Sequence, residues 1–185
     1  KEIKKRNGIN RALTRLQYTM AQDPAPVMGL DIINTVYGSG FQMNTDTLEE
    51  TIDAVTDKIE KEYQEGKNIG KRPRILVTGS PSGGAALKVI RAIEENGGVV
   101  VCFENCTGMK PLAEVDEENP DVYDALSRKY LSIGCSCMSP NKARMELLEK
   151  VIKDFKADAV VDLVVQACDT DNVETAMVKK LVKDK

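Results

Sequence analysis

Three cysteines in this sequence occupy predicted loops beside strands or helices, and cysteine thiolates are the usual protein ligands of iron–sulfur clusters. Cys106 and Cys168 each follow a short run rich in valine, and Cys135 precedes a helix expected to begin near Pro140. In an open α/β sheet, ligand sites form at the carboxyl ends of the strands, so these loops are expected to converge at one edge. A helix N-terminus after Cys135 and Cys168 would add partial positive charge. The pattern predicts a sulfur-ligated metal site.

The residues alone leave other interpretations open for each cysteine. A single loop cysteine is often a small buried hydrophobic residue, and the intervals of 29 and 33 residues between the three match no CxxC ferredoxin run. Cys102 lies inside an expected strand and is assigned to the core. Cys137, two residues from Cys135, is either a fourth ligand or only a neighbour.

Two further groups lie where expected strands end. The segment TGSPSGG, which contains Gly79 and Ser80, lies where a phosphate-binding loop would lie, yet it lacks the GKS/T ending of a P-loop and the GxGxxG order of a dinucleotide fold. It is either a tight turn between strand and helix or a wall of a substrate or cluster pocket. Glu104 is either an acid that supports Cys106 or a solvated loop carboxylate.

The composition excludes several kinds of site. Among 185 residues there is no histidine, which excludes a Ser-His-Asp triad, a Cys-His pair and histidine-ligated haem or zinc within this chain. Five cysteines are an odd number and too few for a secreted disulfide scaffold. The net charge is −3 and basic and acidic residues are interspersed, so the sequence has no basic patch of the kind that binds nucleic acid. No apolar run approaches the roughly 20 residues of a membrane span. We expect a cytoplasmic protein without nucleic-acid or membrane partners.

The elements that position the loops follow from the hydrophobic periodicity. Residues 1–70 have apolar residues at helical spacing, so they are expected to form a helical segment that ends a preceding domain or links to it. Residues 71–185 alternate short apolar strands with helices, which predicts an α/β domain with a three-layer, Rossmann-like or flavodoxin-like, mostly parallel sheet. The alternation calls for one more strand after the final helix, so the domain is expected to be truncated before its last strand.

Four segments at these loops carry a resemblance to a known family: RILVTGSP, VVVCFENCTG, YLSIGCSCMSPNKAR, and VVQAC with the helix that follows it. The chain resembles the iron–sulfur D-components of radical 2-hydroxyacyl-CoA dehydratases and benzoyl-CoA reductases, best over residues 72–182. The combination of ENCTG and CSCMSPN is most similar to the branch of double-cubane cluster proteins. The resemblance implies that the sequence is a C-terminal fragment.

The resemblance also implies a function. Cys106, Cys135 and Cys168 would hold a 4Fe-4S cluster, or one half of a double cubane, in a low-potential radical lyase or oxidoreductase of anaerobic metabolism. Single electrons would come from an ATP-hydrolysing iron–sulfur activator protein, and the substrate would be an acyl-CoA or, in the double-cubane branch, a small molecule. A homodimer or heterodimer partner is implied, and the isolated fragment is expected to be inactive, with the cluster absent or incomplete.

Two alternatives from other classes of protein remain. One is a non-catalytic zinc module that uses Cys135, Cys137 and another thiolate. The other is a CoA-binding α/β module without metal, based on the TGSPSGG turn.

Overall fold

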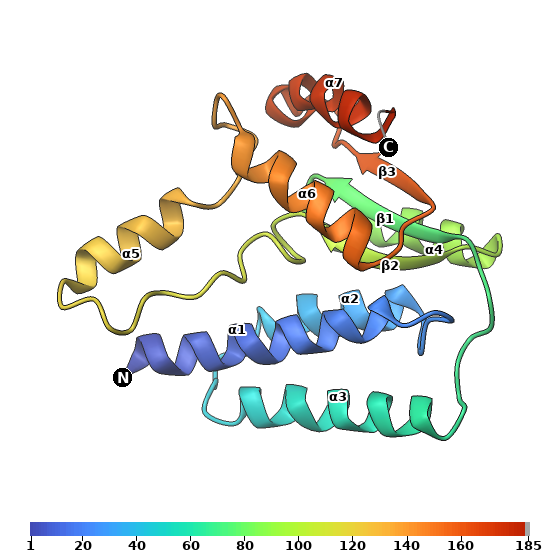
Figure 1. Cartoon of the computed structure of the whole chain (residues 1–185), viewed down its shortest axis with the longest axis horizontal. Coiled ribbons are helices and arrows are strands. Elements are labelled where there is room, and N and C mark those ends of the chain that lie inside the picture. The colour runs from blue at the N-terminus through green and yellow to red at the C-terminus, as the bar shows by residue number, and fades with distance from the viewer. Residues whose placement is uncertain (184–185) are drawn as a thin grey trace.

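A three-stranded sheet and the helices around it make up the computed structural model, which describes residues 1–183 (Figure 1). The elements are α1 (Glu2–Tyr18), α2 (Gly29–Ser39), α3 (Leu48–Gln64), β1 (Arg74–Gly79), α4 (Leu87–Glu95), β2 (Val99–Glu104), α5 (Val122–Leu131), α6 (Lys142–Asp154), β3 (Ala159–Leu163) and α7 (Asp169–Lys183). Short 3-10 turns occupy Thr19–Ala21 and Gly84–Ala86. None of the described helices has the length and apolar character needed to cross a bilayer.

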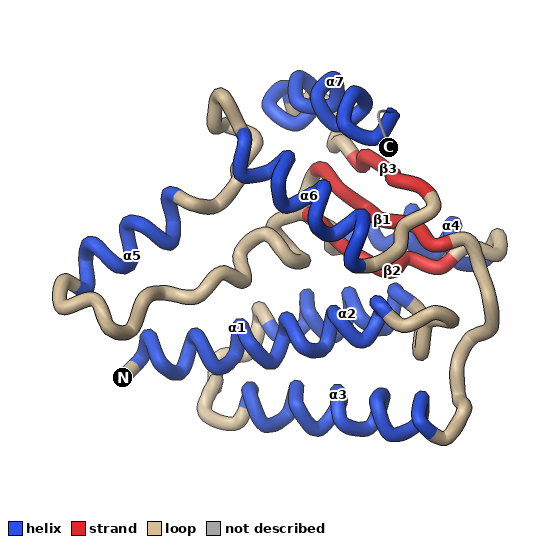
Figure 2. The backbone as a smooth tube through the Cα atoms, viewed as in Figure 1, coloured by secondary structure: helices blue, strands red, loops and turns tan. Residues whose placement is uncertain are grey.

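The sheet is all parallel, with β1 in the middle and the strands in the order β2-β1-β3. This is the beginning of the flavodoxin-like strand order, so the predicted α/β fold with a parallel sheet is confirmed. Because the strands are parallel, the loops that follow them leave from the same edge, as Figure 2 shows. Within residues 1–183 no strand follows α7, and the expected additional strand stays a prediction.

The strands bury apolar residues on both faces, which explains their valine-rich sequences. On one face Leu76 of β1 packs in a cluster with Leu16 of α1 and Leu148 of α6. On the other face Val77 packs with Ile90 of α4. The result is three layers of helix, sheet and helix. The helices of residues 1–64 contribute apolar side chains to the cluster that contains Leu76.

Glu94 fastens the N-terminus of α2 to the sheet. Its carboxylate accepts hydrogen bonds from the backbone N–H groups of Gly29 (2.7 Å) and Leu30 (3.1 Å), and from that of Val100 in β2 (3.2 Å). The first N–H groups of a helix have no partner within the helix and favour negative charge. A buried carboxylate therefore joins the helical segment to the α/β layers.

Replacing Glu94 with glutamine should lower the free energy of unfolding by about 1.5–3 kcal/mol, the usual contribution of hydrogen bonds to a charged group. An amide has only one accepting oxygen for three donors, and it carries no charge toward the helix. Urea denaturation measures the difference. Glu95→Gln is the matched control, because Glu95 is exposed and adjacent; equal effects of the two changes would contradict the assignment.

Candidate metal centre at the carboxyl edge of the sheet

The structure places the three predicted ligand cysteines on separate loops around the carboxyl edge of the sheet. Cys106 is two residues beyond β2 and is exposed. Cys168 directly precedes α7, and its thiol donates a hydrogen bond to the carboxylate of Asp171, with 3.4 Å between the atoms. Cys135 lies between α5 and α6; like Cys168, it is half-buried.

The three thiols do not form a ready-made site for a single ion. Among residues 1–183, no three Cys, Asp or Glu side chains are close enough together to hold one metal ion. A multi-iron cluster binds each cysteine through a different iron, so its ligands need not touch one another. Cysteine thiols are the usual ligands of such clusters, so three of them on loops at one edge of the sheet are a suitable ligand set.

The Cys135 loop is held against α6 by glycine and asparagine. A Cβ atom on Gly134 would lie 2.6 Å from the backbone nitrogen of Arg144, so only glycine allows this approach. The Asn141 amide donates to the Cys135 carbonyl oxygen (2.8 Å) and to Glu174 (2.6 Å). The helix predicted to begin near Pro140 is confirmed as α6, which begins at Lys142 after the Cys135 loop.

The Cys168 loop does precede a helix N-terminus directly, as predicted. The backbone N–H of Asn172 donates to the Cys168 carbonyl oxygen (3.0 Å), which forms the first turn of α7. Free N–H groups at such a terminus favour an anionic ligand.

The TGSPSGG segment is a turn whose side chains fasten the neighbouring loops. Gly79 has φ +96°, and a Cβ there would lie 2.4 Å from the Leu163 carbonyl oxygen, so the turn requires glycine. The Ser80 hydroxyl donates to the Asp171 carboxylate (2.7 Å) and accepts from the backbone N–H of Val165 (3.2 Å). Ser80 thus holds both sides of the Cys168 loop.

Asn105, a residue that the sequence analysis missed, shapes the Cys106 loop. Its amide donates to the Ser82 hydroxyl (2.7 Å), and its carbonyl oxygen accepts from the backbone N–H groups of Thr107 (3.0 Å) and Gly108 (3.1 Å). An asparagine that bonds to the backbone two residues ahead, with glycine one residue further, is a recognised turn pattern. The sequence Asn105-Cys106-Thr107-Gly108 matches this turn pattern.

A β-bulge directs Glu104 into the interior. Ile75 pairs with Val100, but Leu76 pairs with Cys102, so β2 contains one extra residue. Bulges redirect the side chains that follow them. Glu104 lies opposite Thr78, whose hydroxyl donates a short hydrogen bond to it, and its side chain is fully buried. The alternative of a solvated loop carboxylate is therefore wrong.

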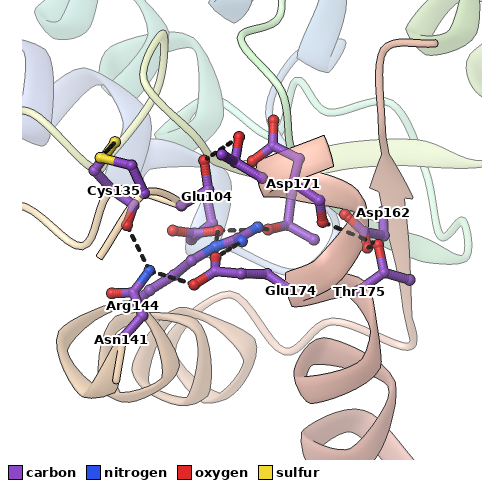
Figure 3. A network of polar contacts seen from close by, with 12 residues as sticks. Glu104, Cys135, Asn141, Arg144, Asp162, Asp171, Glu174 and Thr175 are labelled. Carbon is purple, nitrogen blue, oxygen red and sulfur yellow. Dashed lines mark hydrogen bonds and ion pairs between the residues drawn. The ribbon is translucent and has the colours of Figure 1, made fainter. Parts of the chain in front are cut away.

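Arg144 of α6 is the centre of a buried ionic network beneath the cysteine loops (Figure 3). Its guanidinium forms a short ion pair with Glu174 of α7, donates to the Thr78 hydroxyl (3.1 Å) and lies 3.5 Å from the Glu104 carboxylate. Lys110, also buried, lies 3.5 Å from the other oxygen of Glu104. The buried network thus contains two basic side chains and two carboxyl groups.

The surroundings change the pKa values of the site in different directions. Burial raises the pKa of Glu104, and nearby cations offset only part of that rise. Although Cys106 is exposed, the protein atoms around its sulfur displace part of the water and raise the pKa of the thiol, against the effect of Lys110. The backbone N–H and then the thiol of Cys137 lower the pKa of Cys135. A thiol with a lowered pKa more readily forms the thiolate, which is the form that binds metal.

Cys102 lies in the core, as predicted. Its side chain is 2% exposed and belongs to the apolar cluster on the α6 face of the sheet. Burial raises the pKa of its thiol well above the ordinary value, so this cysteine forms the thiolate less readily than an exposed one.

Replacing Ser80 with alanine should lower the free energy of unfolding by about 1.5–3 kcal/mol, because Asp171 loses a hydrogen bond to its charged carboxylate. Amide hydrogen exchange in residues 164–171 should become faster at the same time, since the Cys168 loop loses its fastening. Ser127→Ala on the exposed face of α5 is the control. Unchanged exchange in residues 164–171 would contradict this role for Ser80.

Two comparisons with known proteins show what the chain is similar to. A family model described as "2-hydroxyglutaryl-CoA dehydratase, D-component" matches residues 1–185. The chain is 45% identical over 178 residues, or 96% of its length, to "Putative dehydratase subunit YjiM" from Escherichia coli (strain K12). The aligned region is 46% of that protein, so the chain spans about half the length of the curated relative that it matches.

Proposed function

The chain belongs to the family of the 2-hydroxyglutaryl-CoA dehydratase D-component, and from this premise we propose that it is the iron–sulfur part of a dehydratase-type enzyme. Cys106, Cys135 and Cys168 are the proposed cluster ligands. The main support is that the loops of Cys106 and Cys168 follow the carboxyl ends of two strands of one parallel sheet, where α/β folds place their ligands. The Cys135 loop, between α5 and α6, lies beside them, because the Ser136 hydroxyl donates to that of Thr170 (3.4 Å).

Each proposed ligand has its own support from the chain. Asn105 shapes the loop of Cys106, Asn141 holds the backbone of Cys135, and the first turn of α7 presents N–H groups beside Cys168. A cluster held by these three cysteines would supply single-electron chemistry at low potential. The residues of this chain hold, orient and partly shield it.

The Glu104 carboxyl has the properties of a proton-holding group under this site. It is buried two residues before Cys106, and burial raises its pKa, so it retains a proton more readily than an exposed glutamate. Its Oε1 atom has no hydrogen-bond partner among the described residues. We assign Glu104 a supporting role in the charge balance of the cluster loops.

The partners and the substrate of the whole protein belong to the same proposal. We propose an acyl-CoA substrate, an ATP-hydrolysing activator that delivers electrons, and a second subunit, and we place the reaction in the cytoplasm, where thiols remain reduced. We further propose that the helices of residues 1–70 connect the cluster-binding layers of residues 71–185 to the rest of the enzyme.

Metal analysis of the full-length protein, purified without oxygen, tests the proposal. We expect iron and acid-labile sulfide in nearly equal amounts, in a brown protein. A colourless protein with stoichiometric zinc would contradict it and would favour the zinc module, for which the 3.4 Å contact between the Cys135 and Cys137 sulfurs is the supporting observation. CoA binding in a metal-free protein, unaffected by cysteine-to-serine changes, would favour the CoA-binding module instead.

A further inference from the structure

Cys135 has a second thiol directly beside it, and that thiol has no role in the proposed function. The sulfur atoms of Cys135 and Cys137 lie 3.4 Å apart, with the Cys137 thiol as the donor. The two residues share a tight turn, because the backbone N–H of Met138 donates to the Cys135 carbonyl oxygen (2.9 Å). Cys137 is exposed, whereas Cys135 is half-buried.

The geometry allows a covalent bond between these two sulfurs. Two residues span at most about 7 Å of chain, and a tight turn shortens this, so the Cα atoms fall in the range that disulfides use. The sulfurs must approach from 3.4 Å to the usual bond length of about 2.05 Å, which small side-chain rotations achieve in a surface loop.

The other cysteines lack such a partner among the described residues. The Cys168 sulfur contacts the side chains of Thr170 (3.5 Å) and Asp171 (3.4 Å), which are oxygen groups. Cys102 is buried in β2, where a dissolved oxidant has no access. The contact between Cys135 and Cys137 is the one pair of sulfurs within hydrogen-bonding distance in residues 1–183.

We propose that Cys135 and Cys137 form a reversible redox modification site, at which a small-molecule disulfide converts the two thiols to an internal disulfide whenever no metal is bound. The role of Cys135 as a cluster ligand comes from the proposed function, and the consequence for the cluster rests on it. The disulfide removes Cys135 from the ligand set and returns it on reduction.

The exchange proceeds in two balanced steps. The Cys137 thiolate, which is exposed, attacks one sulfur of the small disulfide RSSR, forms a mixed disulfide and releases the first RS⁻. The Cys135 thiolate then attacks the Cys137 sulfur and releases the second RS⁻. The two protein thiols lose two protons and two electrons, and RSSR becomes two RSH.

The modification protects a residue that oxidation would otherwise destroy. A free thiolate oxidises through sulfenic acid to sulfinic and sulfonic acids, and the last two forms are in general not reversible. An internal disulfide stops this sequence at a state that cellular thiols reduce. The pair therefore keeps the cluster site available after the cluster is lost.

Peptide mapping of the metal-free full-length protein after treatment with glutathione disulfide tests the proposal. After alkylation and trypsin digestion, Cys135 and Cys137 lie together on residues 130–142, Cys102 and Cys106 on residues 92–128, and Cys168 on residues 157–179. We expect the peptide of residues 130–142 to carry no alkyl group and to be lighter by two hydrogens than the reduced peptide. After treatment with dithiothreitol, both of its cysteines should become alkylated. Doubly alkylated residues 130–142, or a cross-link to either other peptide, would overturn the proposal.

Two variants and one uptake measurement complete the test. Cys137→Ser should leave Cys135 as a mixed disulfide with glutathione or as the alkylated thiol, whereas Cys106→Ser should still form the internal disulfide. The oxidised full-length protein should lose its iron uptake until dithiothreitol is added. If the disulfide forms and iron uptake is unchanged, the redox site stands and Cys135 is not a cluster ligand, so the two proposals fail separately.

Discussion

Replacing Arg144 with methionine should lower the free energy of unfolding by about 3–5 kcal/mol, the usual cost of removing one partner from a buried ion pair. The change leaves Glu104 and Glu174 without the guanidinium that lies between them. Methionine fills a comparable volume, so the loss comes from the uncompensated carboxylates and not from a cavity. Urea denaturation, with an unchanged m-value, measures the difference.

Two further variants separate this explanation from a general packing defect. Arg91→Met removes an exposed arginine from α4 and should change stability by less than about 0.5 kcal/mol. Glu174→Gln in the Arg144→Met background should restore part of the loss, because it removes one of the stranded carboxylates. We expect a coupling of about 0.5–3 kcal/mol between the two changes. Strict additivity would contradict the proposed network.

Replacing Cys168 with serine should lower the iron content of the full-length protein by more than about tenfold. Changes to residues that only orient metal ligands already cost about 10–100-fold in affinity, and here a soft sulfur ligand is lost. Anaerobic reconstitution followed by iron and sulfide analysis measures the effect. The same loss is expected for Cys106→Ser and Cys135→Ser.

The matched control for these variants is Cys102→Ala. Its sulfur is buried in β2 and faces the apolar cluster, so the protein should lose some stability and retain the iron of the wild-type protein. Wild-type iron content in Cys168→Ser would contradict the ligand assignment. If the Cys102→Ala variant folds fully but loses its iron, the assignment of Cys102 to the core is contradicted.

Local patterns in the sequence were sufficient to predict the layered fold. The valine-rich stretch before Glu104 is buried on both faces of a parallel sheet, and such strands have continuous apolar sequences. Chain connectivity through helices then required parallel strands. The placement of Cys106 and Cys168 beyond strand ends follows from the same reasoning, because it depends only on where each strand ends.

The ionic network beneath the cysteines depends on contacts that sequence patterns do not show. The bulge that turns Glu104 inward has no distinct signal in a run of valines. Arg144 and Glu174 are 30 residues apart and belong to different helices, so only the packing of α6 on α7 brings them together. Arg144 has one signal that was overlooked: it shares a helical face with Leu148 and Val151, which are buried.

Mössbauer spectroscopy most directly tests whether Cys106, Cys135 and Cys168 together hold one iron–sulfur cluster. The full-length protein should be reconstituted without oxygen with iron-57 and sulfide, alongside the three cysteine-to-serine variants. We expect cluster iron in the wild-type protein, with one iron distinct from those bound to cysteine, and at least about tenfold less cluster iron in each variant. A wild-type spectrum with only unclustered iron, or cluster iron retained by all three variants, would contradict it.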